Sequence, residues 1–210
     1  MTTIKREYIK IISTFVVASF VVICVIYFKF IGKEVTLTNL CKVGSYATTA
    51  TTVLWIVWNS WLWRMPLVCK ISSVPDLTGR WVGYYRRNGR GSDGKQHTYV
   101  LEIQQTYSTI WCTTYQDNHT SSAGIVSELC VLPDKRASVV FHWAGTRTAE
   151  EKNTALGPNY QGLTSLIYSK AIGGKTAELK GDYFTDQGTT GHVVVKFVSK
   201  SILGRFDLDS

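Results

Sequence analysis

The chain has 210 residues, 45% hydrophobic and 18% charged, a composition that excludes a disordered protein and fits a globular or partly membrane-bound one. The formal net charge is +8, but residues 1–75 hold 8 Lys and Arg against 2 Asp and Glu, whereas residues 76–210 hold 15 against 13. Because the positive excess flanks apolar segments, it favours a membrane surface as partner over a DNA or RNA polymer.

The first apolar segment, Ile11–Phe28, contains no charge and is bracketed by Lys10 and Lys29. At about 1.5 Å per residue it just covers a ~30 Å hydrocarbon core. A cleaved signal peptide is the alternative, although no small-residue cleavage site follows the segment. We predict a transmembrane helix at about residues 9–31.

A second uncharged run, Val43–Trp63, has its indoles toward one end, as at a membrane–water boundary: Trp55, Trp58, Trp61 and Trp63. It predicts a second span at about residues 43–64, within a membrane anchor of residues 1–75. Small residues three or four apart could form a helix–helix contact face or could simply be tolerated by the lipid bilayer: Gly44, Ala47, Thr48 and Thr51. Basic residues cluster after this run and predict that both termini and the C-terminal domain are cytoplasmic: Arg80, Arg86, Arg87 and Arg90.

From residue 76 onward, short β-rich runs separated by turn residues replace the helical pattern. We count eight: Leu77–Arg87, Gln96–Tyr107, Thr109–Asp117, Gly124–Leu132, Ala137–Ala144, Gln161–Ala171, Thr176–Thr185 and Thr190–Lys200. Since closure removes both sheet edges, they predict an antiparallel eight-stranded meander β-barrel over residues 76–210, lipocalin-like, with a sandwich as the alternative. The long connection Gly145–Asn159 is either a lid or binding loop or a surface insertion.

Alternation in the first run, "GRWVGYYRR", leaves two possible inward faces. Trp81, Gly83, Tyr85 and Arg87 form one, and Arg80, Val82, Tyr84 and Arg86 form the other. Trp81 favours the first, because a bulky ring can close one end of a small barrel. Further aromatic candidates for the interior are Tyr99, Tyr115, Trp143 and Tyr183, although each alone is also explained as core packing.

The last turn, "TDQGTTGH", would bring Thr189, Thr190 and His192 to the barrel mouth. Aromatic rings stack bases, at roughly 1–3 kcal/mol per base, and an Arg guanidinium binds phosphate bidentately. Turn amides and hydroxyls complete an anion site. The predicted ligand-binding set is therefore Tyr85, Arg87, Tyr99, Tyr115, Trp143, Tyr183, Thr189, Thr190 and His192.

The chain resembles, over essentially its whole length, the two-transmembrane β-barrel effectors of CBASS anti-phage defence. The resemblance rests on the two N-terminal apolar segments taken together with two stretches of the β domain, "DLTGRWVGYY" and "ELKGDYFTDQGTTGHVVVKF". The resemblance implies a bacterial inner-membrane protein whose barrel binds a cyclic oligonucleotide, typically a cyclic dinucleotide, made by a cognate CD-NTase. It further implies homo-oligomerisation on binding, membrane disruption and abortive infection, without a cofactor.

Three other functions stay open. A membrane-tethered, lipocalin-like binder of lipid or another small molecule would need an apolar cavity, and a structural anchor would need no ligand. An enzyme would use acids or bases such as Glu102, Glu128, His142, Asp182 or His192. No catalytic motif accompanies these residues, so we expect no catalytic residue and no enzymatic activity. The five cysteines show no metal spacing, and we expect no metal site.

Overall fold

The computed structural model describes residues 3–32, 34–65, 74–88, 94–116, 121–132, 136–146 and 159–207. The chain divides into two units, one of residues 1–73 with Thr106–Ser108 and one of Val74–Gln105 with Thr109–Ser210.

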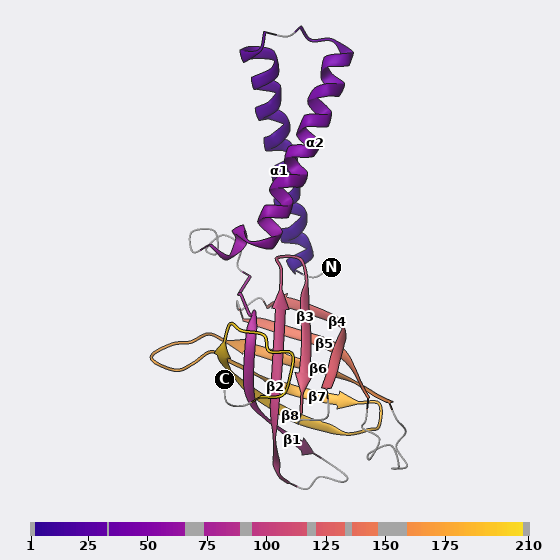
Figure 1. The fold of residues 1–210 in the computed structure, drawn as a ribbon, viewed down its shortest axis with the longest axis vertical. Coiled ribbons are helices and arrows are strands. Elements are labelled where there is room, and N and C mark those ends of the chain that lie inside the picture. The colour runs from indigo at the N-terminus through magenta and orange to yellow at the C-terminus, as the bar shows by residue number, and fades with distance from the viewer. Residues whose placement is uncertain are drawn as a thin grey trace. The chain divides into compact units, whose positions relative to one another are not determined.

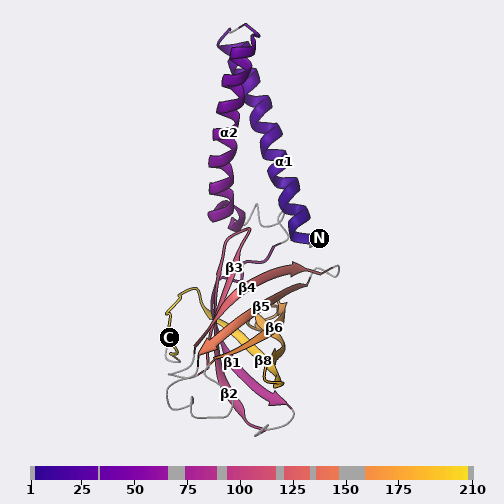
Figure 2. The same ribbon diagram turned by 90° about the vertical axis from the view of Figure 1, so that its right-hand side faces the viewer.

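The first unit is a helical hairpin. Helix α1 (Thr3–Cys24) continues as a π-helical stretch, η1 (Val25–Phe30), and α2 (Leu37–Ser60) runs back beside it (Figures 1 and 2) before a short 3₁₀ turn, η2 (Leu62–Arg64). The side chain of Thr36 caps α2 by accepting a hydrogen bond from the backbone N–H of Asn39 at 3.3 Å.

Within the described residues, one helical segment, Lys10–Phe30, is long and apolar enough to cross a membrane, so the predicted second span is not confirmed. The hydroxyl residues of α2 lower its apolar character. Thr48, Thr49 and Thr52 nevertheless donate their hydroxyl hydrogens to the carbonyls four residues earlier, at 2.9–3.1 Å. Their polar groups are therefore satisfied inside the helix.

The small residues of α2 lie toward α1, and the close helix–helix contact predicted for them stays a prediction. A groove between the helices is lined from α1 by Val16, Val17, Phe20 and Val21, and from α2 by Gly44, Ala47, Thr48, Thr51 and Thr52. Next to the groove residue Val16, the ring of Phe15 packs edge-on against Trp58 at 5.5 Å. Aromatic side chains therefore contribute to the contact between the two helices.

The second unit is a closed barrel of eight antiparallel strands in sequence order (Figure 1), which confirms the predicted meander and excludes the sandwich. The strands are β1 (Gly79–Asn88), β2 (Gln96–Gln105), β3 (Ile110–Tyr115), β4 (Ser121–Val131), β5 (Ala137–Thr146), β6 (Asn159–Ser169), β7 (Glu178–Thr185) and β8 (Thr190–Ser199). Strand β5 ends at Thr146 and β6 begins at Asn159. Between them, residues 147–158 of the predicted connection Gly145–Asn159 lie outside the described residues.

One strand boundary differs from the prediction by three residues, and the others differ by two at most. Strand β4 begins at Ser121 rather than Gly124, because a bulge between Gly124 and Val126 breaks its alternation. Strand β2 ends at Gln105, and Tyr107 belongs with the helical unit, where its ring lies edge-on to Trp58 at 5.7 Å.

One end of the barrel interior is filled by aromatic packing, and we call it the plug end. The ring of Trp81 meets Phe197 at 5.3 Å and Tyr168 at 6.2 Å, both edge-on. The indole N–H of Trp81 donates to the Leu77 carbonyl at 3.0 Å, so this buried ring leaves no donor unsatisfied. The plug end is a packed core, as the sequence predicts for Trp81.

Candidate functional site

The strand register decides which side chains enter the barrel. Trp81, Gly83, Tyr85 and Arg87 alternate on one face of β1, and that face continues across the register partners Gly83↔Tyr99 and Arg87↔Gly191. The first of the two faces considered for β1 is therefore the inward one. Tyr99, Trp143 and Tyr183 also lie inside and are nearly buried, at 4%, 5% and 8% exposed.

At the end opposite the plug, aromatic rings gather around Tyr85, and we call this the tyrosine end. The Tyr85 ring lies edge-on to Tyr99 and Tyr183, both at 6.0 Å, and is stacked on His97 at 5.1 Å with 22° between the planes. The guanidinium carbon of Arg87 lies 5.9 Å from the centre of the Tyr85 ring. A cation thus covers the aromatic cluster where β1 ends.

Trp143 forms a second part of the tyrosine end. Its indole N–H donates to the Thr164 hydroxyl at 2.8 Å, and its ring lies edge-on to Tyr160 at 5.5 Å. Two inward-facing glycines make room for the rings. A Cβ on Gly162 would lie 2.3 Å from the Trp143 ring, and one on Gly191 would lie 2.4 Å from the Tyr183 ring.

Burial raises the pKa of Tyr183 to about 12, although the nearby Arg87 guanidinium and its hydrogen bond to the phenol oppose the increase. Burial also raises the pKa of the Tyr99 phenol above its ordinary value of 10.0. Both phenols therefore stay protonated and can act as hydrogen-bond donors at neutral pH. Together with Arg87, they suit an anionic ligand that also carries planar groups.

The hydroxyl-rich turn between β7 and β8 uses part of its polar groups on itself. The Thr185 and Thr189 hydroxyls lie 2.5 Å apart, and the backbone N–H of Thr189 donates to the Thr185 hydroxyl at 3.1 Å. Gly188 has φ +72°, a left-handed conformation that favours glycine. Thr189 therefore helps to form the turn. That it also binds a ligand stays a prediction.

Three predicted site residues lie on the outer face. Tyr115 is the register partner of Val100, one residue from the inward Tyr99, so the expectation that it faces the interior is wrong. Thr190 and His192 pair with Phe184 and Asp182 on the outside of β7. The Nδ1 atom of His192 lies 2.9 Å from an Asp182 carboxylate oxygen. For Tyr115, a one-residue shift in the alternation of β3 accounts for the difference. Thr190 and His192 were predicted from their place beside the turn and not from a strand face.

Sequence reasoning missed two residues of the tyrosine end, His97 and Tyr160. His97 is the register partner of Tyr85, and Tyr160 is the partner of Gly145 beside Trp143. In the sequence, His97 stands two residues before Tyr99. Residues two apart on a strand lie on the same face, so this spacing could have placed His97 inside the barrel. Tyr160 follows the long connection, where alternation gave no reference point.

Glu102, which was considered for catalysis, and the thiol of Cys112 both have structural explanations. Among the described residues no cluster of three His, Cys, Asp or Glu side chains could hold a metal. Glu102 pairs with Arg80, and burial raises the pKa of Cys112 to about 12, so its thiol stays protonated. The tyrosine end offers aromatic rings for stacking, the Arg87 guanidinium and phenol hydrogen-bond donors. These groups are typical of a binding site and not of a catalytic one.

A comparison with protein-family models matches residues 72–196 to the family described as Cap15, cyclic dinucleotide receptor domain. The matched residues contain every inward side chain of the tyrosine end. No curated protein matches the chain.

Proposed function

The chain belongs to the family of Cap15 cyclic dinucleotide receptor domains, a binding effector of CBASS rather than an enzyme, and we propose that its nucleotide binds at the tyrosine end of the barrel. We further propose that binding drives self-association in the bacterial inner membrane and disrupts that membrane. Infected cells would then stop growing before phage release. The nucleotide would come from a cognate CD-NTase.

The observation that supports this site is the position of Arg87 over Tyr85, with the Tyr183 phenol within hydrogen-bond reach of the guanidinium. A cyclic dinucleotide carries two phosphate charges and two bases. Arg87 would bind a phosphate, and a base would take the place of the guanidinium on the Tyr85 ring. Because Tyr85 is 7% exposed, the ligand has to displace Arg87 to reach it.

For the membrane part, we propose that α1 and α2 both span the bilayer, with both termini and the barrel in the cytoplasm. The apolar segment Lys10–Phe30 supports the first span. The internally bonded hydroxyls of Thr48, Thr49 and Thr52 support the second, since they remove the main cost of placing threonines in lipid.

The test is thermal unfolding of the full chain in lipid nanodiscs with 3′,5′-linked cyclic di- and trinucleotides of adenine, guanine and uracil, and with fatty acids as a separate arm. A ligand at a hundredfold excess over its Kd adds about 2.7 kcal/mol to the free energy of unfolding. We expect one or two cyclic nucleotides to raise the melting temperature. A shift with fatty acids alone would replace the proposal with the lipid-binding function.

Membrane disruption needs its own measurement. We expect the nucleotide that stabilises the chain to release a trapped dye from liposomes containing the chain, whereas liposomes without it stay sealed. Binding without dye release would retain the receptor site and reject the proposed outcome of binding.

A further inference from the structure

On the outer surface of the barrel, β1 and β2 carry an ion pair from which water is excluded. Arg80 is 0% exposed and Glu102 is 3% exposed, and the Arg80 Nη1 lies 2.5 Å from the Glu102 Oε1. The two residues are register partners on the face opposite Trp81. Charged side chains on the outside of a barrel are ordinarily solvated, so a further element has to cover this pair.

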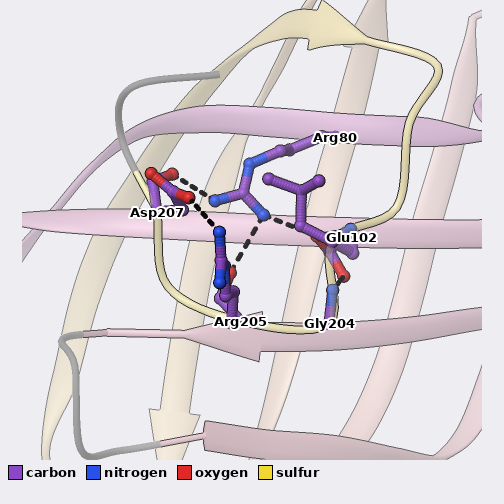
Figure 3. Close-up of polar contacts among 6 residues, drawn as sticks. Arg80, Glu102, Gly204, Arg205 and Asp207 are labelled. Carbon is purple, nitrogen blue, oxygen red and sulfur yellow. Dashed lines mark hydrogen bonds and ion pairs between the residues drawn. The ribbon is translucent and has the colours of Figure 1, made fainter.

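The cover is the chain's own segment Leu203–Asp207, which we call the C-terminal strap (Figure 3). The backbone N–H groups of Leu203 and Gly204 donate to the two carboxylate oxygens of Glu102, at 2.9 and 3.1 Å. Gly204 has φ +68°, so the bend that aims these groups at Glu102 favours glycine.

The guanidinium of Arg80 completes the contact from the other side of the pair. It donates to the backbone carbonyl of Arg205 at 3.0 Å and to that of Asp207 (Figure 3). All four hydrogen bonds therefore reach backbone atoms of the strap. The Arg80–Glu102 pair recognises a bent peptide through its N–H and C=O groups, and any copy of the strap presents the same groups.

The strap is held at this site without deep burial of its own side chains. Leu203 is 36% exposed, Arg205 is exposed, and the preceding Lys200 and Ser201 are exposed as well. Release of the strap leaves Arg80 and Glu102 paired with each other, so neither charge loses its counter-ion. Detachment therefore breaks a surface contact and leaves the barrel core in place.

We propose that the Arg80–Glu102 pair is a docking site for the strap of a second copy, and that copies exchange straps when they assemble. This inference rests on the proposed self-association. Each copy has one strap and one docking site. When a copy receives the strap of one neighbour and gives its own strap to another, the contact is head-to-tail and extends to further copies. The strap lies beyond the matched residues 72–196.

Two variants of the full chain in detergent test the exchange. The first ends after Ile202 and keeps an intact docking site without a strap. The second, Glu102→Ala, keeps its strap without an intact docking site. Neither can form the complete contact alone, but in an equal mixture the strap of the second can make all four hydrogen bonds on the first. The probe is each 3′,5′-linked cyclic dinucleotide of adenine, guanine and uracil in turn, and the readout is particle mass.

We expect the unaltered chain to form assemblies of several copies, each variant alone to stay at one copy, and the mixture to stop at twice that mass. Assembly of the truncated chain as large as that of the unaltered chain would overturn the exchange and leave the proposed function standing. So would single copies in the mixture, because the strap would then act only within its own chain. Single copies of the unaltered chain that still bind nucleotide would reject self-association itself, and the exchange with it.

If either variant fails to fold, Gly204→Pro and Glu102→Gln take their places. Gly204→Pro removes one N–H and disfavours the bend without altering the barrel. Glu102→Gln keeps the shape of the docking site and removes its charge. Circular dichroism of each variant checks the fold before the masses are compared, and the expected masses are unchanged.

Discussion

The plug end and the tyrosine end of the barrel use similar rings for different purposes. At the plug end, Trp81 packs against two rings and gives its one polar hydrogen to a backbone carbonyl. At the tyrosine end, Tyr85 lies under a guanidinium and on an imidazole. Aromatic content alone therefore does not separate packing from binding in a small barrel. The charged and titratable neighbours of each ring do.

The largest expected effect is on the plug end. Trp81→Ala should lower the free energy of unfolding by about 3–5 kcal/mol, because it opens a cavity in a packed core. Chemical denaturation of the full chain measures this loss. Nucleotide affinity of the remaining folded protein should stay within about twofold, since the ring is distant from Arg87 along β1. A parallel loss of affinity would mean that the two ends do not act separately.

Arg87→Ala should do the reverse at the tyrosine end. Loss of a charged hydrogen-bond donor should weaken nucleotide binding by about 10- to 100-fold, equivalent to about 1.5–3 kcal/mol. The free energy of unfolding should change by less than about 0.5 kcal/mol, because the residue is exposed. Arg86→Ala, one residue away on the outer face, is the matched control in titration calorimetry. If both variants weakened nucleotide binding equally, Arg87 would act only through the net charge of the protein and not through a contact with the ligand.

A smaller effect is expected from the Tyr183 phenol. Its folded-state pKa is about 12 and its ordinary value is 10.0, so the neutral phenol favours the folded state below pH 10 and this contribution is lost between pH 10 and 12. Tyr183→Phe should remove that part of the alkaline loss of stability. It should also weaken nucleotide binding by about 1 kcal/mol if the phenol donates to the ligand. Unchanged alkaline unfolding would show that the phenol is solvated.

The smallest effect concerns Asp76, near the start of the barrel. Burial raises its pKa, but hydrogen bonds from Lys200 and Thr78 outweigh burial, and the pKa lies below 3.8. The ionised carboxylate therefore stabilises the fold above pH 3.8, and this contribution is lost as the pH falls further. Lys200→Ala should lower stability at neutral pH by at most about 1 kcal/mol, because the lysine is exposed. Denaturation at pH 7 and pH 3 should give a smaller difference for the variant than for the unaltered chain.

The barrel was predictable because eight β-rich runs with turn residues between them fit one closed meander. Inward residues were predictable on β1, where Trp81 fixed the face. They were not predictable on β3 or β8, where Tyr115 and His192 had no such reference and a one-residue shift reverses every side chain. Arg80 and Glu102 look like ordinary surface charges in the sequence. Their burial depends on a strap about 100 residues further along the chain.

Strand β1 places two arginines with unlike surroundings on one rigid element. Arg80 points outward to the strap and Arg87 points inward to the tyrosine end, seven residues further along. An odd number of steps along a strand separates opposite faces. Insertion or deletion of a single residue between them would place both arginines on the same side of the sheet, and either the strap or the inner cluster would lose its cation. The length of β1 is thus a constraint in its own right. This stretch can change its side chains one at a time, but a change in their number by one needs a compensating β-bulge to keep both arginines in place.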